Sequence, residues 1–239
     1  MWIATGSGYV ADIVGGSGID WVLLDQEHVP NDLTSALAQL QVLAAHPAVD
    51  VVVRPPVADP VLIKQLLDIG AVNLMVPMIE TAEAAAAAVA ATRYPPEGIR
   101  GVGSALARAS GWNRIPDYLA TAGERISLTV QVETVAALER LEVICAVSGV
   151  DAVFIGPADL AASMGKLGQP EHPDVVRTIE NALARIAKTG KGVGVNAFNE
   201  EIARRYQAAG ATFVLVGADV TILARGAEQL AAKYRRPES

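Results

Sequence analysis

Two acidic residues, Glu133 and Asp159, lie at the ends of consecutive apolar runs. Glu133 closes the run 127–133, and Asp159 comes shortly after the run 152–156. Runs of this kind form strands buried on both faces, where an ionised carboxylate is costly unless it is paired or binds a cation. Carboxylate oxygens are ligands that Mg²⁺ and Mn²⁺ prefer. The pair therefore predicts a divalent-metal site that leaves coordination positions open for water and a bidentate substrate.

The same two positions have a structural alternative. Both acids precede helical patterns, and a carboxylate can cap a helix N-terminus by accepting backbone N–H groups. Asp159, directly before Leu160-Ala-Ala, is the better candidate for such a cap. Capping and metal binding can coexist, so the sequence leaves both roles open.

His28 is the best candidate for proton transfer among the three histidines. It follows the apolar run 20–25, within the segment Asp25-Gln-Glu-His28. Neighbouring acids can raise the pKa of an imidazole and fix its tautomer, as an acid/base group requires. The alternative is an ordinary loop histidine.

Arg54 is the expected cationic group of the site. It ends the uncharged run 51–53, which argues against a solvated surface role. A buried guanidinium can stabilise an oxyanion or bind a carboxylate; the alternative is a structural ion pair with Asp25 or Asp68. Lysine chemistry is disfavoured, because a Schiff base needs a lysine at the active end and only Lys166, on an expected loop, could approach it.

These residues need a fold that brings the ends of several strands together. Gly70, Gly190 and Gly210 each follow a helical stretch and precede a strand, as a helix C-terminal glycine does. Helical spacing covers 33–45, 61–69 and 81–92, among others. Eight runs rich in valine and isoleucine predict strands at 2–5, 20–25, 50–55, 73–78, 127–133, 152–156, 192–196 and 213–217.

The alternation of strands and helices favours an α/β fold, a (β/α)8 barrel of the TIM type formed by residues 1–239 as a single domain. An open doubly wound sheet is the main competitor. The long connection 94–124 predicts a lid or an interface loop. In a barrel, chemistry gathers at the carboxyl ends of the strands. Five more polar or small residues are expected at that end: Gln131, Gly156, Ala158, Asn196 and Asp219.

Composition limits the class of protein. The chain is 51% hydrophobic and 19% charged, which excludes disorder and mildly favours an oligomer. Its net charge of -7 argues against a nucleic-acid partner. There is no signal peptide and no long uncharged apolar run, so no membrane association is expected. The single cysteine, Cys145, cannot form an internal disulfide, and a reducing, cytoplasmic setting is expected.

A series of short motifs runs along nearly the whole chain. Each is weak alone, but together and in this order they are specific: Leu24-Asp-Gln-Glu-His28, Val53-Arg-Pro55, Lys64 to Ala71, Arg93-Tyr-Pro-Pro96 with Arg100-Gly-Val-Gly103, Gln131-Val-Glu133 and Phe154 to Leu160. With them the chain resembles the class II (metal-dependent) pyruvate aldolases of the bacterial 4-hydroxy-2-oxoheptanedioate aldolase family, the hydroxyketoacid aldolases.

The resemblance implies how the site binds its ligands. Glu133 and Asp159 would hold a divalent metal ion, Mg, Mn or Co. Gln131 and the backbone of Ala158, with the adjoining Gly156 and with Asp159 itself, would hold the pyruvate moiety.

The resemblance also implies the catalytic groups. His28 would be the acid/base, and Arg54 would stabilise the transition state. Asp68 would raise the basicity of His28, although the sequence pattern alone places Asp68 on a helix surface.

The implied reaction is reversible aldol cleavage of a 4-hydroxy-2-oxo acid to pyruvate and an aldehyde, through a metal-stabilised pyruvate enolate. The resemblance implies a homo-hexamer with an exchanged C-terminal helix, in which the loop 101–112 approaches a neighbour's site. Three alternatives stay open: a 2-keto-3-deoxy sugar-acid aldolase with the same site, a lyase of acyl-CoA esters, for which the acidic chain offers little basic surface, and a metal-stabilised scaffold without activity. Asn196 stands where related sequences often have an apolar residue, which leaves the aldehyde undetermined.

Overall fold

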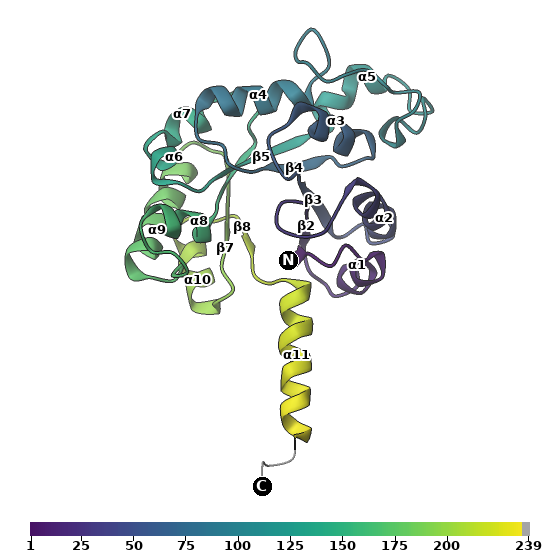
Figure 1. The fold of residues 1–239 in the computed structure, drawn as a ribbon. Coiled ribbons are helices and arrows are strands. Elements are labelled where there is room, and N and C mark those ends of the chain that lie inside the picture. The colour runs from purple at the N-terminus through teal and green to yellow at the C-terminus, as the bar shows by residue number, and fades with distance from the viewer. Residues whose placement is uncertain (236–239) are drawn as a thin grey trace.

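Eight parallel strands form a barrel in which each strand pairs with the next along the chain (Figure 1). The structure is a computed structural model and describes residues 1–235. The strands are β1 (Trp2–Ile3), β2 (Trp21–Asp25), β3 (Asp50–Arg54), β4 (Asn73–Val76), β5 (Ser127–Val132), β6 (Ala152–Ile155), β7 (Gly192–Asn196) and β8 (Phe213–Leu215).

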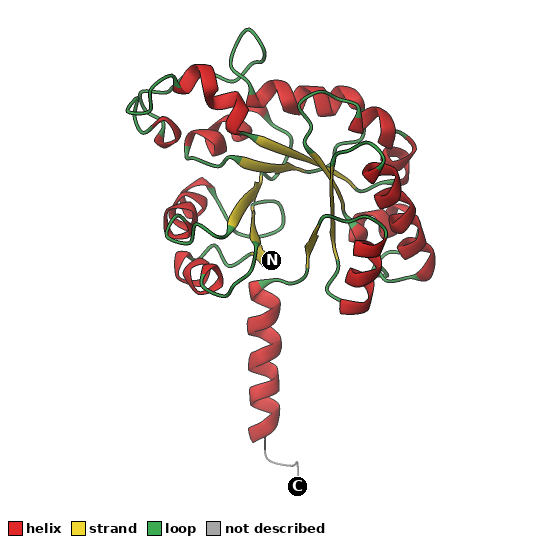
Figure 2. Cartoon of the chain, turned by 180° about the vertical axis from the view of Figure 1, so that it is seen from behind, coloured by secondary structure: helices red, strands yellow, loops and turns green. Residues whose placement is uncertain are grey.

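Helices alternate with the strands and cover the outside of the barrel, apart from the last helix (Figure 2). The α-helices are α1 (Gly8–Gly15), α2 (Leu33–Leu43), α3 (Pro60–Asp68), α4 (Ala82–Thr92), α5 (Tyr118–Thr121), α6 (Val135–Glu139), α7 (Leu141–Cys145), α8 (Pro157–Ser163), α9 (Pro173–Ala187), α10 (Glu200–Ala208) and α11 (Asp219–Tyr234). Two 3₁₀ turns, η1 (Arg108–Ser110) and η2 (Ala122–Arg125), flank α5.

The barrel closes between its first and last strands through a single bridge and one carboxylate. Trp2 N–H donates to the carbonyl of Gly217 at 2.8 Å, and Trp2 pairs with Ala218 in parallel. The buried carboxylate of Asp219 accepts hydrogen bonds from the backbone N–H groups of Ala4 (2.8 Å) and Thr5 (3.1 Å). Asp219, expected among the residues of the working face, therefore fastens the end of β8 to β1.

The predicted barrel is confirmed, and the open-sheet alternative is wrong because β1 and β8 meet. All eight predicted strands are present, and all but β7 are one or two residues shorter than their apolar runs. Gly70, Gly190 and Gly210 adopt φ values of 102°, 76° and 112°, a left-handed conformation that glycine enters without steric cost. The last four residues of the predicted domain, 236–239, lie outside the described residues.

Two apolar layers support the mouth of the barrel. The larger one lies between the strands and the surrounding helices. The smaller one fills the barrel interior and is centred on Leu23, Met75, Phe154 and Leu215. Gly194 makes room for this plug, since a Cβ there would lie 2.3 Å from the ring of Phe213. The plug supplies a rigid, dry floor beneath the polar residues at the carboxyl ends of the strands.

The long connection between α4 and β5 is more ordered than its sequence predicted. The segment contains η1, α5 and η2 and projects from the barrel next to α3 (Figure 1). Arg108 joins the two elements, because its Nη1 donates to the carbonyl of Ile69 at 2.9 Å. The segment is thus anchored to the barrel on the α3 side.

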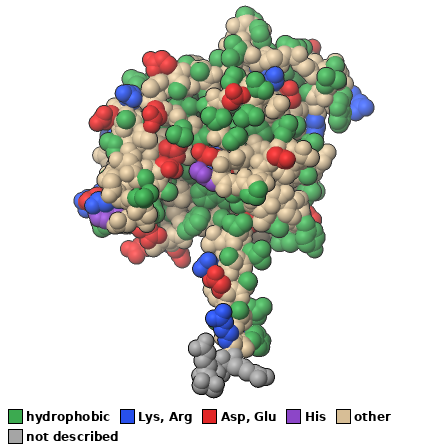
Figure 3. Space-filling model, in the orientation of Figure 1, with side chains coloured by type: hydrophobic (Ala, Val, Ile, Leu, Met, Phe, Trp, Pro, Cys, Tyr) green, Lys and Arg blue, Asp and Glu red, His purple; other side chains and the backbone are tan. Residues whose placement is uncertain are grey.

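Helix α11 leaves the barrel and extends away from it (Figure 1). Apolar side chains lie along one side of the projecting helix and charged ones along the other (Figure 3). Its exposed apolar residues are Val220, Ile222, Leu223, Leu230 and Tyr234. No helix within residues 1–235 is both long and apolar enough to cross a membrane.

Candidate active site

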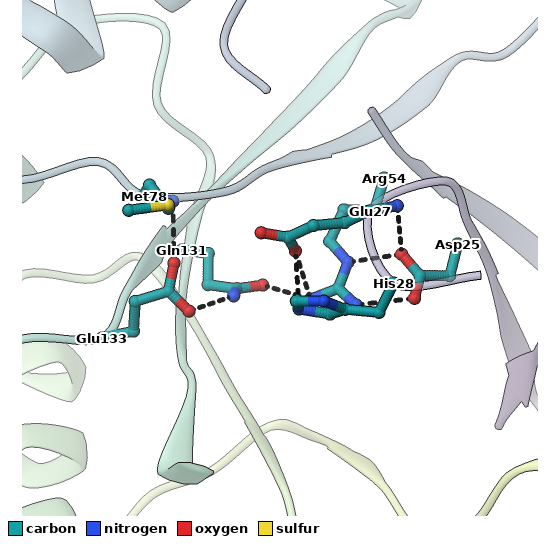
Figure 4. A network of polar contacts seen from close by, with 7 residues as sticks. All are labelled: Asp25, Glu27, His28, Arg54, Met78, Gln131 and Glu133. Carbon is teal, nitrogen blue, oxygen red and sulfur yellow. Dashed lines mark hydrogen bonds and ion pairs between the residues drawn. The ribbon is translucent and has the colours of Figure 1, made fainter. Parts of the chain in front are cut away.

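A polar network lies at the carboxyl ends of β2, β3 and β5 (Figure 4). Alternate strand residues point into the barrel, and the last inward position of each strand faces its mouth. Asp25 and Arg54 are register partners at the ends of β2 and β3. Gln131 and Glu133 are two residues apart on and just beyond β5 and therefore face the same side. Parallel strands thus bring together groups that are up to 108 residues apart.

Arg54 organises this network. Its side chain is buried, with Nε and Nη2 each 2.8 Å from one oxygen of Asp25, a bidentate pair. Its Nη1 lies 2.9 Å from Glu27 Oε2 and 3.2 Å from Gln131 Oε1. Of the two ion-pair partners considered from the sequence, Asp25 is therefore the one that holds Arg54. The pairing fixes the plane of the guanidinium, which is what a group that must meet a substrate oxygen requires.

Glu133 is 4% exposed and held by two donors. Its Oε1 accepts the backbone N–H of Met78 at 2.9 Å, and its Oε2 accepts Gln131 Nε2 at 2.5 Å. Burial raises the pKa of this carboxyl, and the charges of Glu27 and Asp159 raise it further, against the two hydrogen bonds. Thr134, not Glu133, caps α6. The capping alternative is wrong for Glu133, which is free to act on a ligand.

Asp159 lies in the first turn of α8, where the N-cap residue is Gly156 and no side chain caps the helix. The expectation that Asp159 is an N-cap is therefore wrong, because α8 starts two residues earlier, at Pro157. Its carboxylate is near enough to Glu27 and Glu133 to raise the pKa of both by charge repulsion. Ala158 occupies the same exposed turn. The structure thus brings the two predicted metal ligands to one mouth.

Gly156 is required by the position of Glu133. A Cβ at residue 156 would lie 2.8 Å from Glu133 Oε2 and 3.0 Å from Glu133 Cβ. We expect Gly156→Ala to displace the carboxylate and lower kcat/KM for aldol cleavage by roughly 10²-fold, as misplaced catalytic groups do. Gly217→Ala, at the end of β8, is the control, since nothing lies within 4 Å of its added Cβ. Equal activity of the two variants in a pyruvate-release assay would contradict this role.

Glu27 is a member of the site for which the sequence pattern predicted no role beyond that of an acid near His28. Burial raises the pKa of its carboxyl, with Asp25 and Asp159 adding to the rise and Arg54 and His28 opposing it. Its buried Oε2 is paired by charge with Arg54, yet no donor is aligned to hydrogen-bond it. The signal available was its place beside His28, just after a buried strand.

His28 lies at the rim of the same network. Its side chain is 61% exposed, and its Nε2 is 3.5 Å from Glu27 Oε2. The imidazole is therefore accessible to a ligand in the mouth and has a carboxylate beside it. An exposed imidazole paired with an acid can take up and return a proton.

Asp68 is not part of this network within one chain. It ends α3, and its Oδ1 accepts a hydrogen bond from Arg100 Nη2 at 2.7 Å. The carboxylate beside His28 is that of Glu27. The role of Asp68 as a partner of His28, implied by the resemblance, stays a prediction.

Asn196 faces the mouth at the end of β7, as its place in the predicted strand implied. It lines a cavity of about 220 Å³ together with Pro157 and Phe198. The ring of Phe198 packs edge-on against Trp2, with centroids 5.8 Å apart. This side of the mouth therefore combines one amide with aromatic surface.

The charge balance of the mouth fits a divalent cation. Asp25, Glu27, Glu133 and Asp159 carry four carboxylates against the single guanidinium of Arg54, a formal excess of three negative charges when His28 is neutral. Within residues 1–235, no group of three or more acidic, His or Cys side chains is close enough to enclose a metal by itself. Asp159 is exposed at this mouth and Glu133 is buried beneath it, and both offer the hard oxygen donors that a divalent cation prefers.

The sequence matches one family model over residues 1–226, that of the HpcH/HpaI aldolase/citrate lyase family. The chain belongs to this family. A hydroxypyruvate/pyruvate aldolase of Deinococcus radiodurans is 58% identical over 98% of this chain and 84% of its own length. A 4-hydroxy-2-oxo-heptane-1,7-dioate aldolase of Salmonella arizonae is 55% identical over 98% of this chain and 89% of its own.

A solved structure shows the same barrel. The HpcH/HpaI aldolase/citrate lyase family protein from Burkholderia cenocepacia has a TM-score of 0.93 and 41% identity, over 99% of this chain and 93% of its own. Membership of the HpcH/HpaI family confirms the resemblance seen in the sequence motifs. It also confirms the assignment of the chain as an aldolase-type carbon–carbon lyase.

Proposed function

We propose that the chain catalyses metal-dependent, reversible aldol cleavage of 4-hydroxy-2-oxo acids to pyruvate and an aldehyde. The observation that carries the proposal is the buried carboxylate of Glu133, which Gln131 links to a guanidinium held in one orientation. Asp159 is near enough for its charge to raise the pKa of Glu133. A divalent cation held by Glu133 and Asp159 would act as a Lewis acid toward the carboxylate and keto oxygens of the substrate. The aldolase names of the relatives support this reaction class.

The side chains of the mouth have complementary parts in the cleavage. His28 would take the proton from the 4-hydroxyl as the C3–C4 bond breaks and its electron pair passes into the pyruvate enolate, which becomes pyruvate when C3 gains a proton. During addition His28 would return the proton to the aldehyde oxygen. Arg54 would face the substrate oxygen on which negative charge develops, where a preorganised cation is most effective. Glu27, 3.5 Å from His28 Nε2, would stabilise the imidazolium that proton uptake creates. Gln131, which is hydrogen-bonded to both side chains, would hold Glu133 and Arg54 in fixed positions relative to each other.

Removal of the metal tests this proposal. We expect EDTA treatment to abolish pyruvate release from 4-hydroxy-2-oxoheptanedioate and Mg²⁺ or Mn²⁺ to restore it. The loss of activity should reach at least about 10³-fold, since a Lewis acid lowers the activation barrier by several kcal/mol. Thermal unfolding of the stripped protein is the control that separates loss of chemistry from loss of fold. Full activity after EDTA, with no metal detected by elemental analysis, would contradict the proposal.

A 2-keto-3-deoxy sugar acid is the second candidate substrate. Asn196 supports it, because an amide at the mouth offers hydrogen bonds to a hydroxylated aldehyde that an apolar side chain would not. Pyruvate addition to glyceraldehyde and to succinic semialdehyde, compared by kcat/KM, decides between the two acceptor classes.

We propose that α11 packs on another copy of the chain in a homo-hexamer, because its apolar side lies away from its own barrel. Ile222→Glu with Leu223→Glu should then lower the mass measured by light scattering. Leu167→Glu, at a still more exposed apolar residue outside α11, should leave the mass unchanged. A monomeric wild-type chain would contradict the proposal. The cytoplasmic location also stays a proposal, supported by the buried free thiol of Cys145.

A further inference from the structure

A second polar pocket lies at the end of the barrel opposite the mouth. It is bounded by the end of α3, the connection 100–126 and the residues just before β4 and β5, with apolar walls that include Leu67, Val72 and Ile126. Because Val72 and Ile126 precede strands whose carboxyl ends form the mouth, this pocket is separate from the candidate active site. We call it the arginine pocket, since Arg100, Arg108 and Arg125 line it.

Arg100 is the anchor of the arginine pocket. Its side chain is fully buried, and its guanidinium lies over the ring of Tyr94, 4.5 Å from the centroid. Its Nη2 donates to Asp68 and, at 3.4 Å, to the hydroxyl of Tyr118. Its Nε and Nη1 have no hydrogen-bond partner among residues 1–235. Three N–H donors of a buried cation are therefore left unused, an arrangement that costs free energy unless a ligand accepts them.

The other two arginines keep the pocket positive. Arg108 is half-buried and uses one nitrogen, Nη1, to bind the carbonyl of Ile69, while Arg125 is exposed. No acid is among the residues of 1–235 that line the pocket. Three guanidinium groups against the one carboxylate of Asp68 leave a formal excess of two positive charges.

We propose that the arginine pocket binds a small dianion through a carboxylate or phosphate-type group. Arginine forks match such oxygens in geometry as well as in charge. The cavity of about 370 Å³ has the size of small-molecule sites, and its apolar walls suit a short carbon chain. The ligand is bound at the connection 100–126, apart from the network that Arg54 organises in the same chain.

Sulfate and succinate are suitable probes, because both are dianions. Sulfate is a tetrahedral oxyanion like phosphate, and succinate is a short dicarboxylate. Calorimetric titration at constant ionic strength, with pyruvate and Mg²⁺ saturating the mouth, should give saturable binding of at least one. The tighter probe identifies the class of ligand. Binding should also change the emission of Trp112, which lines the pocket, and this signal should be lost in Trp112→Phe.

Matched substitutions locate the binding. Arg125→Gln removes an exposed charge and should fold normally, and we expect about tenfold weaker binding of the probe. Arg108→Met should weaken it at least as much. Arg114→Gln is the control: Arg114 lies in the same connection, 5.4 Å from the ring of Trp112, but does not line the pocket. Its affinity for the probe should stay within about twofold of wild type.

Three results would overturn the proposal. One is the absence of saturable binding of either probe to the wild-type protein. Another is an equal loss of probe affinity in Arg125→Gln and Arg114→Gln, which would mean that binding depends only on the net charge of the protein. The third is a change in the molecular mass measured by light scattering when Arg125 is replaced by Gln. The arginines would then belong to an interface between copies of the chain.

Discussion

Arg54→Lys should lower kcat/KM for aldol cleavage by roughly 10²- to 10³-fold while the barrel still folds. The guanidinium makes two parallel contacts of 2.8 Å with Asp25 and uses its third nitrogen toward Glu27 and Gln131. Lysine keeps the charge but has a single nitrogen, so it cannot bind Asp25 and face a substrate oxygen at the same time. The substitution removes orientation and leaves the net charge unchanged.

The stability of the same variants separates catalysis from folding. Arg54→Met would leave Asp25 buried without a partner and should cost about 3–5 kcal/mol in the free energy of unfolding. Arg54→Lys should cost less, since an ammonium still compensates the carboxylate. Arg204→Lys, in an exposed pair with Glu200, is the control and should change neither quantity. Urea denaturation with pyruvate-release kinetics measures both, and wild-type kcat/KM in Arg54→Lys would rule out the proposed role.

The sequence predicts the barrel because buried parallel strands have continuous apolar runs in their sequence. Glycines mark the C-terminal ends of several helices. It predicts Glu133 and Asp159 for the same reason: an acid directly after such a run is an exception that needs a cause. It does not predict the strand ends, because apolar runs continue past the last ladder hydrogen bond. Glu133 looks like the final residue of a strand that ends at Val132.

Three features of the site depend on three-dimensional relations that no local pattern contains. The choice between Asp25 and Asp68 as partner of Arg54 follows from the register of β2 against β3. Glu27 gains its role from the path of a loop. The N-caps of α6 and α8 are Thr134 and Gly156, because α6 begins one residue later and α8 three residues earlier than caps at Glu133 and Asp159 would require. The direction of α11 is equally hidden, since an apolar helix face has the same pattern whichever barrel it covers.

Glu133→Gln should reduce the affinity for Mg²⁺ and lower kcat/KM for aldol cleavage by at least about 10³-fold. Glutamine retains the shape and can still accept from Met78 N–H, so the barrel should remain intact, although its NH2 would then face the donor Gln131 Nε2 and that one hydrogen bond would be lost. What is lost is one of the two anionic oxygen donors that would hold the cation. Asp159→Asn should have a comparable effect, whereas Glu139→Gln, an acid at the end of α6 outside the network, should have none.

The raised pKa of Glu133 determines how the stability of the metal-free protein should change with pH. Burial raises the pKa of Glu133 above its ordinary value of 4.5, and Glu27 and Asp159 raise it further by repulsion. A group whose pKa is higher in the folded chain favours folding when protonated. The metal-free protein should therefore lose stability as the pH rises from below 4.5 through the raised pKa, and a divalent cation should reverse that loss.

Metal affinity should follow the opposite course, because proton and cation compete for the same oxygens. It should weaken as the pH falls through the raised pKa of Glu133, with the steepest part of this dependence absent in Glu133→Gln. Calorimetric titration of the stripped protein with Mn²⁺ across this range, next to urea denaturation without metal, measures both trends. An affinity that does not change with pH would mean that Glu133 is not a ligand. The raised pKa would then be only the cost of burying a hydrogen-bonded acid beneath the mouth.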